Sequence, residues 1–223
     1  MTLSEKAKAY YGLNDYYEVL SQAEDYPNYI LKKLIPIVKN KVVLDAGCGT
    51  GKYLELLQPY AKELYGVDAA KGQLEIAKNK INKNIEITCS DLEKTKFKDN
   101  TFDVIYSTWA LSTILDNNKK EKVLKELLRI LKKKGKLILV ENDIGGEFET
   151  IRGRYPNITR TKGYNDWVIK KGFKEFKKIK TYFLFDSNKT SKEVFKAIYN
   201  EETARKVNKK IKHNVIMYCL CKL

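Results

Sequence analysis

Short apolar segments alternate with helical segments between residues 41 and 141, and this alternation constrains the fold more than any other feature of the sequence. Strands that alternate with helices form βαβ units, which build a parallel sheet buried on both faces. The predicted strands are KVVLD (41–45), ELYGVD (63–68), IEITCSD (85–91), FDVIYS (102–107) and KLILVE (136–141). The predicted helices between them are 52–61, 71–80 and 121–133.

A carboxylate ends each of the first three predicted strands. Asp45, Asp68 and Asp91 are evenly spaced, 23 residues apart, which leaves room for one strand, one helix and two turns per unit. The spacing is a structural period, since the sequence itself does not repeat. An Asp in this place is often only the N-cap of the following helix, so the acids alone do not define a site.

Three alternating glycines, Gly47, Gly49 and Gly51, follow the first predicted strand in LDAGCGTGKY (44–53). Glycine tolerates positive φ and has no Cβ, so we expect a sharp turn that lets a ligand approach the backbone. The turn leads into a helix N-terminus, where backbone N–H groups are expected to be free. A small polar ligand at the carboxyl ends of the strands fits this arrangement.

The glycine spacing excludes two of the three ligand classes that use such turns. A Walker P-loop needs Ser or Thr after Gly-Lys, but Tyr53 follows Lys52. A dinucleotide-binding loop, G-x-G-x-x-G, needs its third glycine where Lys52 stands. A turn for a ligand without phosphate therefore remains.

The pattern D-x-G-x-G-x-G resembles motif I of the class I S-adenosylmethionine-dependent methyltransferases. The resemblance covers about residues 38–141, and extends more loosely to the rest. It is carried by VVLDAGCGTGKYLELL (42–57), LYGVDAAKGQLEIAK (64–78), IEITCSDLEKTKF (85–97), FDVIYSTWALSTI (102–114) and LLRILKKKGKLILVE (127–141). It implies S-adenosyl-L-methionine as cofactor and S-adenosyl-L-homocysteine as product.

The resemblance also implies roles for individual residues. Asp68 holds both ribose hydroxyls, Asp91 and Leu92 flank the adenine, and Asp45 brings negative charge near the ammonium and the sulfonium. Cys48 is expected to pack as a small residue under the turn and not to act as a nucleophile. The implied cofactor-binding residues are Asp45, Ala46, Gly47, Cys48, Gly49, Gly51, Asp68, Ala69, Asp91, Leu92, Ser107 and Trp109.

The whole chain is expected to form one methyltransferase domain with a Rossmann-like α/β fold. Two further predicted strands, 173–185 and 214–223, complete a mostly parallel seven-stranded sheet in the order 3-2-1-4-5-7-6, with strand 7 antiparallel and helices on both faces. An N-terminal helical cap (1–38) precedes the cofactor-binding core (39–141), and a substrate-side insert with the C-terminal strands follows (142–223). Helices are expected at 4–20, from Pro27 to about Val38, at 166–173 and at 191–210.

The methyl acceptor is the least constrained part of the prediction. No dedicated base is identified: the catalytic residue is unknown, and His213 lies beside the last predicted strand, far in topology from the methyl group. No N-P-P-Y or D-P-P-Y motif follows the fourth strand. The N-terminal segment resembles the lid helix of small-molecule methyltransferases, with the aromatic candidates Tyr10, Tyr11, Tyr16 and Tyr17.

Three functional alternatives stay open. A small-molecule acceptor is favoured, because the chain has a simple core with a lid and an insert. An RNA or protein methyltransferase is the second, because 43 Lys and Arg against 28 Asp and Glu give a net charge of +15. The third is a protein that binds S-adenosylmethionine without transferring its methyl group.

The remaining composition sets the expected surroundings of the protein. The cysteines form no C-x-x-C, and a single His accompanies them, which argues against a metal site. No apolar segment has the length of a membrane span or of a signal peptide, so we expect a cytoplasmic protein without membrane contact. We expect a monomer or a homodimer.

Overall fold

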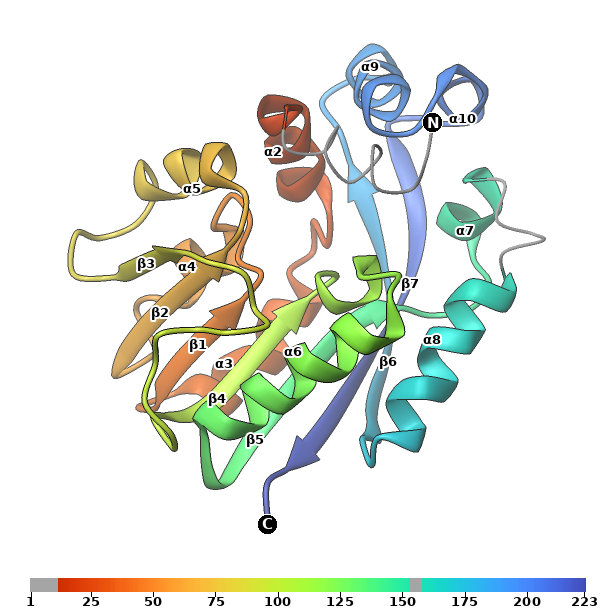
Figure 1. Ribbon diagram of the computed structural model, residues 1–223. Coiled ribbons are helices and arrows are strands. Elements are labelled where there is room, and N and C mark those ends of the chain that lie inside the picture. Colours follow the sequence, from red (N-terminus) through yellow and green to blue (C-terminus); the bar gives the residue numbers. More distant parts are fainter. Residues whose placement is uncertain (1–11, 153–157) are drawn as a thin grey trace.

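One seven-stranded sheet runs through the part of the chain that the computed structural model describes, residues 12–152 and 158–223 (Figure 1). The order is β3-β2-β1-β4-β5-β7-β6. Neighbours from β3 to β5 are parallel, whereas β7 is antiparallel to both β5 and β6. The strands are β1 (Val42–Ala46), β2 (Glu63–Asp68), β3 (Glu86–Cys89), β4 (Phe102–Thr108), β5 (Leu131–Asn142), β6 (Lys174–Leu184) and β7 (Lys210–Cys221). The predicted fold class, strand order and polarity are confirmed.

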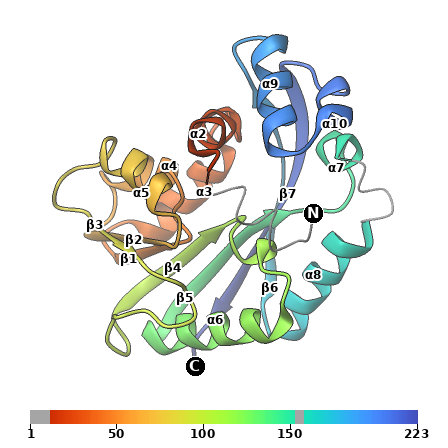
Figure 2. The ribbon, with the colours of Figure 1, turned by 45° about the horizontal axis from the view of Figure 1, so that its top comes forward.

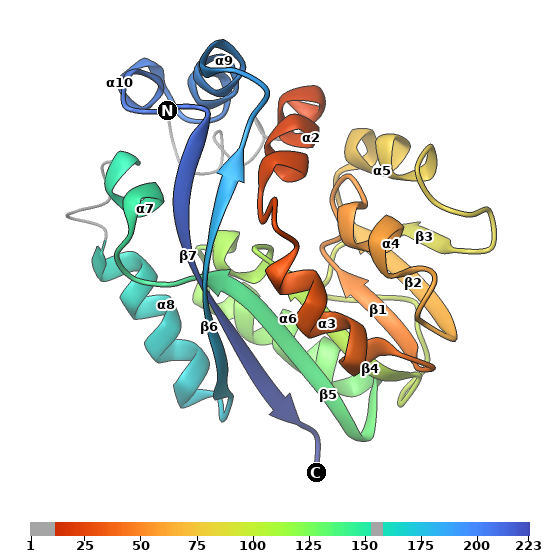
Figure 3. The ribbon, with the colours of Figure 1, turned by 180° about the vertical axis from the view of Figure 1, so that it is seen from behind.

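Helices cover both faces of the sheet. On one face lie α6 (Asn117–Ile130) and α8 (Ile158–Lys170), in front of the sheet in Figure 1. On the other face lie α3 (Tyr29–Val38), α4 (Lys52–Leu57) and α5 (Lys71–Lys78), as the reverse view shows (Figure 3). Because both faces are buried, adjacent residues of one strand enter different cores: Val43 packs with the α3 and α4 side, and Leu44 with the α6 and α8 side.

The remaining helices gather beyond the carboxyl ends of the parallel strands (Figure 2). They are α2 (Asn14–Ala23), α7 (Glu147–Ile151), α9 (Asn188–Ile198) and α10 (Glu201–Arg205), and a 3₁₀ turn, η1 (Leu111–Thr113), follows β4. A third apolar cluster, including Phe148, Phe183 and Phe195, joins these helices to β6 and β7. The carboxyl end of the sheet is therefore enclosed by the chain's own helices.

Buried Lys52 ties α2 to the end of the glycine turn. Its Nζ donates to the backbone oxygens of Ser21, at 2.8 Å, and of Glu24, both at the C-terminal end of α2. An ion pair between Lys80 and Glu18, at 2.7 Å, adds a second link between α2 and the segment after α5. The amino-terminal helix is thus held beside the residues predicted to bind the cofactor.

Several predicted boundaries differ from the structure. The predicted helix 191–210 is two helices, because the Asn200 side chain accepts from Thr203 N at 2.8 Å and caps a new helix there. The helix predicted at 121–133 begins at Asn117, where Asp116 is its N-cap. The third strand ends at Cys89, so Asp91 lies two residues beyond it.

Two further differences concern the last strand and the insert that follows β5. β7 begins at Lys210, four residues earlier than predicted, and so includes His213. The insert is more helical than predicted, since it contains α7 and the first half of α8. Tertiary packing on the sheet decides these boundaries, which local pattern alone leaves open.

Candidate active site

The glycine turn has the positive φ angles that its sequence predicts. Gly47, Gly49 and Gly51 have φ values of +86°, +53° and +80°. A Cβ on Gly47 would lie 2.3 Å from Ala110 Cβ, and one on Gly51 would lie 2.8 Å from Ala77 Cβ. Two of the three glycines are therefore required by contacts within the protein, beyond any ligand.

The amide groups of the turn are already bonded. Gly47 N and Cys48 N both donate to the Val67 carbonyl, at 2.8 and 3.1 Å, and Gly51 N donates to the Cys48 carbonyl at 2.9 Å. Gly49 N donates to the Asp68 carboxylate. The predicted free N–H groups are those of the helix that begins at Lys52, so these four amides do not test that prediction; they are bonded because the turn folds back on β2. A ligand beside these amides meets the Asp68 carboxylate instead.

Asp68 joins the turns that follow β1 and β2. Its Oδ2 accepts from Gly49 N at 2.9 Å and its Oδ1 accepts from Ala70 N at 2.8 Å. Burial raises the pKa of this carboxyl, and the backbone hydrogen bonds oppose that rise. A carboxylate oxygen has two lone pairs, so each oxygen keeps one for a ligand.

Asp45 is buried at the centre of the sheet, with 1% of its surface exposed. It lies beside Tyr106 across the β1–β4 pairing, but neither Asp45 Oδ1 nor the Tyr106 hydroxyl has a hydrogen bond of normal geometry. Burial raises the pKa of Asp45 to about 8; the Tyr106 hydroxyl opposes this rise and the charge of Asp68 adds to it. The carboxyl group is poised to accept a cationic partner.

Buried polar atoms without a partner gather at this end of the sheet. Proteins leave few such atoms, because each costs about 1–3 kcal/mol. Among the described residues, six of them belong to the carboxyl ends of β1, β4 and β5 or to the facing segment of β7: Asp45 Oδ1, Tyr106 Oη, Ser107 Oγ, Trp109 Nε1, Glu141 Oε2 and His213 Nδ1. A polar ligand bound here would give them partners.

His213 lies next to Trp109, contrary to the prediction that it is far from the site. The two rings stack at 5.9 Å, with an interplanar angle of 27°. His213 Nε2 is 2.8 Å from Asn142 Oδ1, and Nδ1 is 3.3 Å from Glu24 Oε1. Burial lowers the pKa of the imidazole well below its ordinary value, so the ring is neutral. The prediction failed because β7 begins at Lys210, four residues earlier than predicted, and so includes His213.

The predicted adenine side is more open. Asp91 is half exposed and pairs with Lys119 Nζ at 2.6 Å. Burial would raise the pKa of Asp91, but the hydrogen bond from Lys119 lowers it overall. Leu92 packs against the core on the α6 side, and Cys48 is buried beneath the turn, beside Gly66. Ala46 ends β1 and Ala69 follows β2, so both lie at the same edge as Asp45 and Asp68.

The predicted lid tyrosines divide into three groups. Tyr16 is 42% exposed on α2, whereas Tyr17 packs against the apolar cluster at the end of the sheet. Tyr10 and Tyr11 lie outside the described residues. Only Tyr17 is thus placed toward the interior by the described part of the helix.

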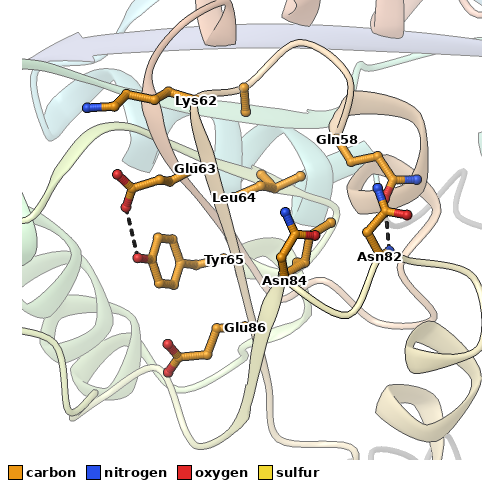
Figure 4. A pocket seen from close by; sticks show the side chains of 10 residues that line it. Gln58, Lys62, Glu63, Leu64, Tyr65, Asn82, Asn84 and Glu86 are labelled. Carbon is orange, nitrogen blue, oxygen red and sulfur yellow. Dashed lines mark hydrogen bonds between the residues drawn. The ribbon is translucent and has the colours of Figure 1, made fainter.

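Figure 4 shows a pocket at the other end of the sheet. Residues from the amino ends of β2 and β3 line it, including Tyr65, which donates to Glu63 at 3.0 Å, and Glu86. The glycine turn lies at the carboxyl ends of these strands, so this pocket is separate from the candidate active site.

Across the described residues, no group of three His, Cys, Asp or Glu side chains is placed to hold a metal ion. No helix within the same residues is long and apolar enough to cross a membrane.

Comparison with known proteins agrees with the fold and with the resemblance seen in the sequence. Residues 44–139 match a family model described as a methyltransferase domain. A methyltransferase structure described as S-adenosylmethionine-dependent, from Aquifex aeolicus, superposes over 98% of both chains with a TM-score of 0.61 at 18% identity. The matched segment includes the glycine turn, Asp68 and Asp91. The resemblance noted in the sequence is thereby confirmed.

Two further comparisons are informative. The N-methyltransferase NodS from Bradyrhizobium japonicum, solved with S-adenosyl-L-homocysteine, has a TM-score of 0.56 at 12% identity and covers 94% of this chain and 98% of its own. At such identities a structural likeness shows the fold alone. The sterol 4-C-methyltransferase strm-1 of Caenorhabditis elegans is 34% identical over 118 residues, which are 51% of this chain and 34% of that protein. The match thus spans about a third of that relative's length.

Asp45 should make stability depend on pH. Its pKa is about 8 in the folded protein against an ordinary 3.8, so the folded state holds the proton more tightly and the free energy of unfolding falls as pH rises between these values. Asp45→Asn cannot ionise. From about pH 5 to about pH 8, the free energy of unfolding should fall by about 1–3 kcal/mol less in Asp45→Asn than in the unmodified protein.

Urea denaturation at the two pH values measures this difference. Asp186→Asn, at an exposed position, is the control and should follow the unmodified protein. Equal pH dependence in Asp45→Asn and the unmodified protein would show that Asp45 is ionised in the folded state without penalty.

Proposed function

We propose that this methyltransferase transfers the methyl group of S-adenosylmethionine to a small-molecule acceptor. The observation that carries the proposal is the set of unpaired buried polar atoms around the glycine turn. They lie where open α/β sheets bind their ligands, at the carboxyl ends of the strands.

The residues present fit this cofactor. It carries a ribose diol, an amino-acid ammonium and a sulfonium, but no phosphate. Asp68 has lone pairs for the two ribose hydroxyls. Asp45 is buried and its Oδ1 has no hydrogen bond, and a bound ammonium would favour the ionised form of this carboxyl. When bound, the cofactor supplies an electrophilic methyl group, while the protein orients the two reactants.

The enclosure of the carboxyl end supports a small acceptor. α2 contacts both α5 and α9, and Lys52 holds its C-terminal end beside the turn. Phe148 of α7 lies 4.7 Å from the ring of Phe183, so the insert is packed down on the same end of the sheet. A macromolecular acceptor would have to displace these contacts. The sterol-methylating relative is consistent with a small acceptor.

One surface favours the alternative of an RNA acceptor. Tyr26 and Tyr29 are 55% and 43% exposed, and the Tyr26 ring lies 6.3 Å from that of Tyr182. Lys210 Nζ stands 4.1 Å from the centre of the Tyr182 ring, and Lys32 Nζ 5.5 Å from that of Tyr29. Aromatic rings with nearby cations are typical of surfaces on which single-stranded bases stack. We call these five residues the aromatic–basic patch.

Substitution of Asp68 tests the proposed cofactor site. Hydrogen bonds to a charged group are worth about 1.5–3 kcal/mol each, and less in partly wet sites. Asp68→Ala should weaken binding of S-adenosyl-L-homocysteine by about 2–4 kcal/mol, or about 30- to 1000-fold. Asp68→Asn keeps the shape and one acceptor, so it should lose less.

Asp186→Asn is the control, because Asp186 is exposed and is not among the residues implied in cofactor binding. It should change the affinity less than Asp68→Ala does. Calorimetric titration measures all three variants, and urea denaturation checks that each folds. Unchanged affinity in a folded Asp68→Ala would show that Asp68 serves only to join the two turns.

RNA binding separates the two acceptor classes. If the acceptor is small, a fluorescein-labelled single-stranded RNA should bind weakly, without sequence preference, and should dissociate steeply as salt rises. Tyr26→Ala should then behave as Tyr60→Ala, a control outside the aromatic–basic patch. Fluorescence anisotropy measures both. Tight binding at physiological salt that Tyr26→Ala abolishes and Tyr60→Ala preserves would favour the RNA methyltransferase.

A further inference from the structure

Glu141 is a buried carboxyl group with one bonded and one unbonded oxygen. It lies near the carboxyl end of β5 and is 0% exposed. Its Oε1 accepts from the Tyr164 hydroxyl at 2.9 Å and from Ser112 N at 3.3 Å. Its Oε2 has no partner among the described residues. The protein therefore fixes one oxygen and leaves the other for a group that it does not itself provide.

Glu141 lies beside the candidate active site, at the carboxyl end of the sheet. Trp109 N donates to the Val140 carbonyl at 2.9 Å, which places the residue after β4 beside the end of β5. Ser107 pairs with Leu139 in the parallel β4–β5 ladder, so Ser107 and Glu141 project from the same face of neighbouring strands. Ser107 Oγ also lacks a partner. Two unpaired polar side chains thus share one face at the predicted cofactor edge.

The surroundings of Glu141 do not pair it with a cation. Arg160 Nη2 donates to the Ser112 carbonyl at 3.2 Å, and Lys120 Nζ lies 5.6 Å from the Tyr164 ring centre. Glu141 Oε2 accepts no hydrogen bond from either of them. The titratable groups that interact with Glu141 are Tyr164 from α8 and Tyr218 from β7; Arg160, Lys120 and Asp143 are the charged groups next to Ser112, Tyr164 and Tyr218.

This environment suits proton transfer at neutral pH. Burial raises the pKa of Glu141 to about 7, and the hydrogen bonds from Ser112 and Tyr164 oppose the rise. A general base works best when its pKa is near the working pH. A carboxylate kept only for structure would have both oxygens bonded or would face a cation.

We propose that Glu141 Oε2 accepts the proton of the attacking nucleophile, and that the acceptor is therefore an amine or a hydroxyl compound. This inference rests on the proposed function. The acceptor's nitrogen or oxygen lone pair forms the new bond to the methyl carbon. The electrons of the broken sulfur–carbon bond stay on sulfur, and the nucleophile's proton passes to Glu141. A carboxylate or thioether acceptor brings no proton to this site.

The experiment compares the unmodified protein with Glu141→Gln, Tyr164→Phe and the control Glu86→Gln. Glu86→Gln makes the same chemical change at an exposed position at the opposite end of the sheet. Each protein is titrated calorimetrically with S-adenosyl-L-homocysteine. Each is then incubated with methyl-labelled S-adenosylmethionine and the small-molecule fraction of a cell extract, over a range of pH.

The expected results separate binding from proton transfer. All four proteins should bind S-adenosyl-L-homocysteine within about twofold of one another. Glu141→Gln should incorporate about 100-fold less label or lower still, the usual effect of losing a general base. Incorporation by the unmodified protein should rise with pH through about 7, because the ionised carboxylate is the active form. In the unmodified protein, the hydrogen bond from Tyr164 lowers the pKa of Glu141. Tyr164→Phe removes this bond, so the midpoint should move to higher pH.

The labelled product distinguishes the acceptors. An N-methyl product is retained by cation exchange, and a methyl ether survives alkali; either agrees with the proposal. Label that alkali releases as methanol marks a methyl ester and would overturn it. The proposal would also be overturned if Glu141→Gln binds S-adenosyl-L-homocysteine and incorporates label at the rate and with the pH profile of the unmodified protein.

Failure of the proposed function has a different signature. An unmodified protein that does not bind S-adenosyl-L-homocysteine contradicts the cofactor assignment itself. Binding without incorporation of label contradicts methyl transfer, and with it the role of Glu141, and supports the alternative of a binding protein.

Discussion

The hydrogen bonds that Asp68 accepts from Gly49 N and Ala70 N hold the candidate active site together. They join the turn after β1 to the turn after β2. In that arrangement Gly49 has a positive φ, and a Cβ on Gly47 or Gly51 would clash with Ala110 or Ala77. The glycine turn is thus shaped by the protein, and the ligand that we propose enters a site whose backbone is already fixed.

The same end of the sheet concentrates carboxyl groups that the protein keeps away from water. Burial raises the pKa of Asp45, Glu24 and Glu141 to about 8, 8 and 7. Each such group disfavours the folded state as pH rises, because it resists ionisation there. Buried carboxyl groups with raised pKa values are typical of functional sites, where the groups are reactive although they lower stability. A bound cation beside Asp45 would offset part of the cost.

The sequence was sufficient to predict the sheet order and the glycine turn, because both leave local patterns. Strand segments, helical spacing and the glycines at 47, 49 and 51 are each recognisable within a few residues. Glu141 and His213 were not recognised as site residues. Glu141 ends a predicted apolar strand, as Asp45 and Asp68 do. The same signal, a carboxylate at the end of a strand, could therefore have identified Glu141 as a site residue.

His213 was misplaced for a different reason. Its position depends on where β7 begins, and the long-range pairing of the first residues of β7 with the end of β6 sets that boundary. The stacking of His213 on Trp109, and the approach of Glu24 from α2, join segments that are far apart in the sequence. Such groups of contacting residues arise from the packed fold, and no local sequence pattern predicts them.

The most direct test of the account is a crystal structure of the protein with S-adenosyl-L-homocysteine. The account predicts the ligand at the carboxyl ends of β1, β2 and β4, with its ribose hydroxyls on Asp68 and its amino group near Asp45. It also predicts partners for the buried polar atoms that now lack them. A ligand bound instead in the pocket between Gln58 and Glu86, at the amino ends of β2 and β3, would contradict it.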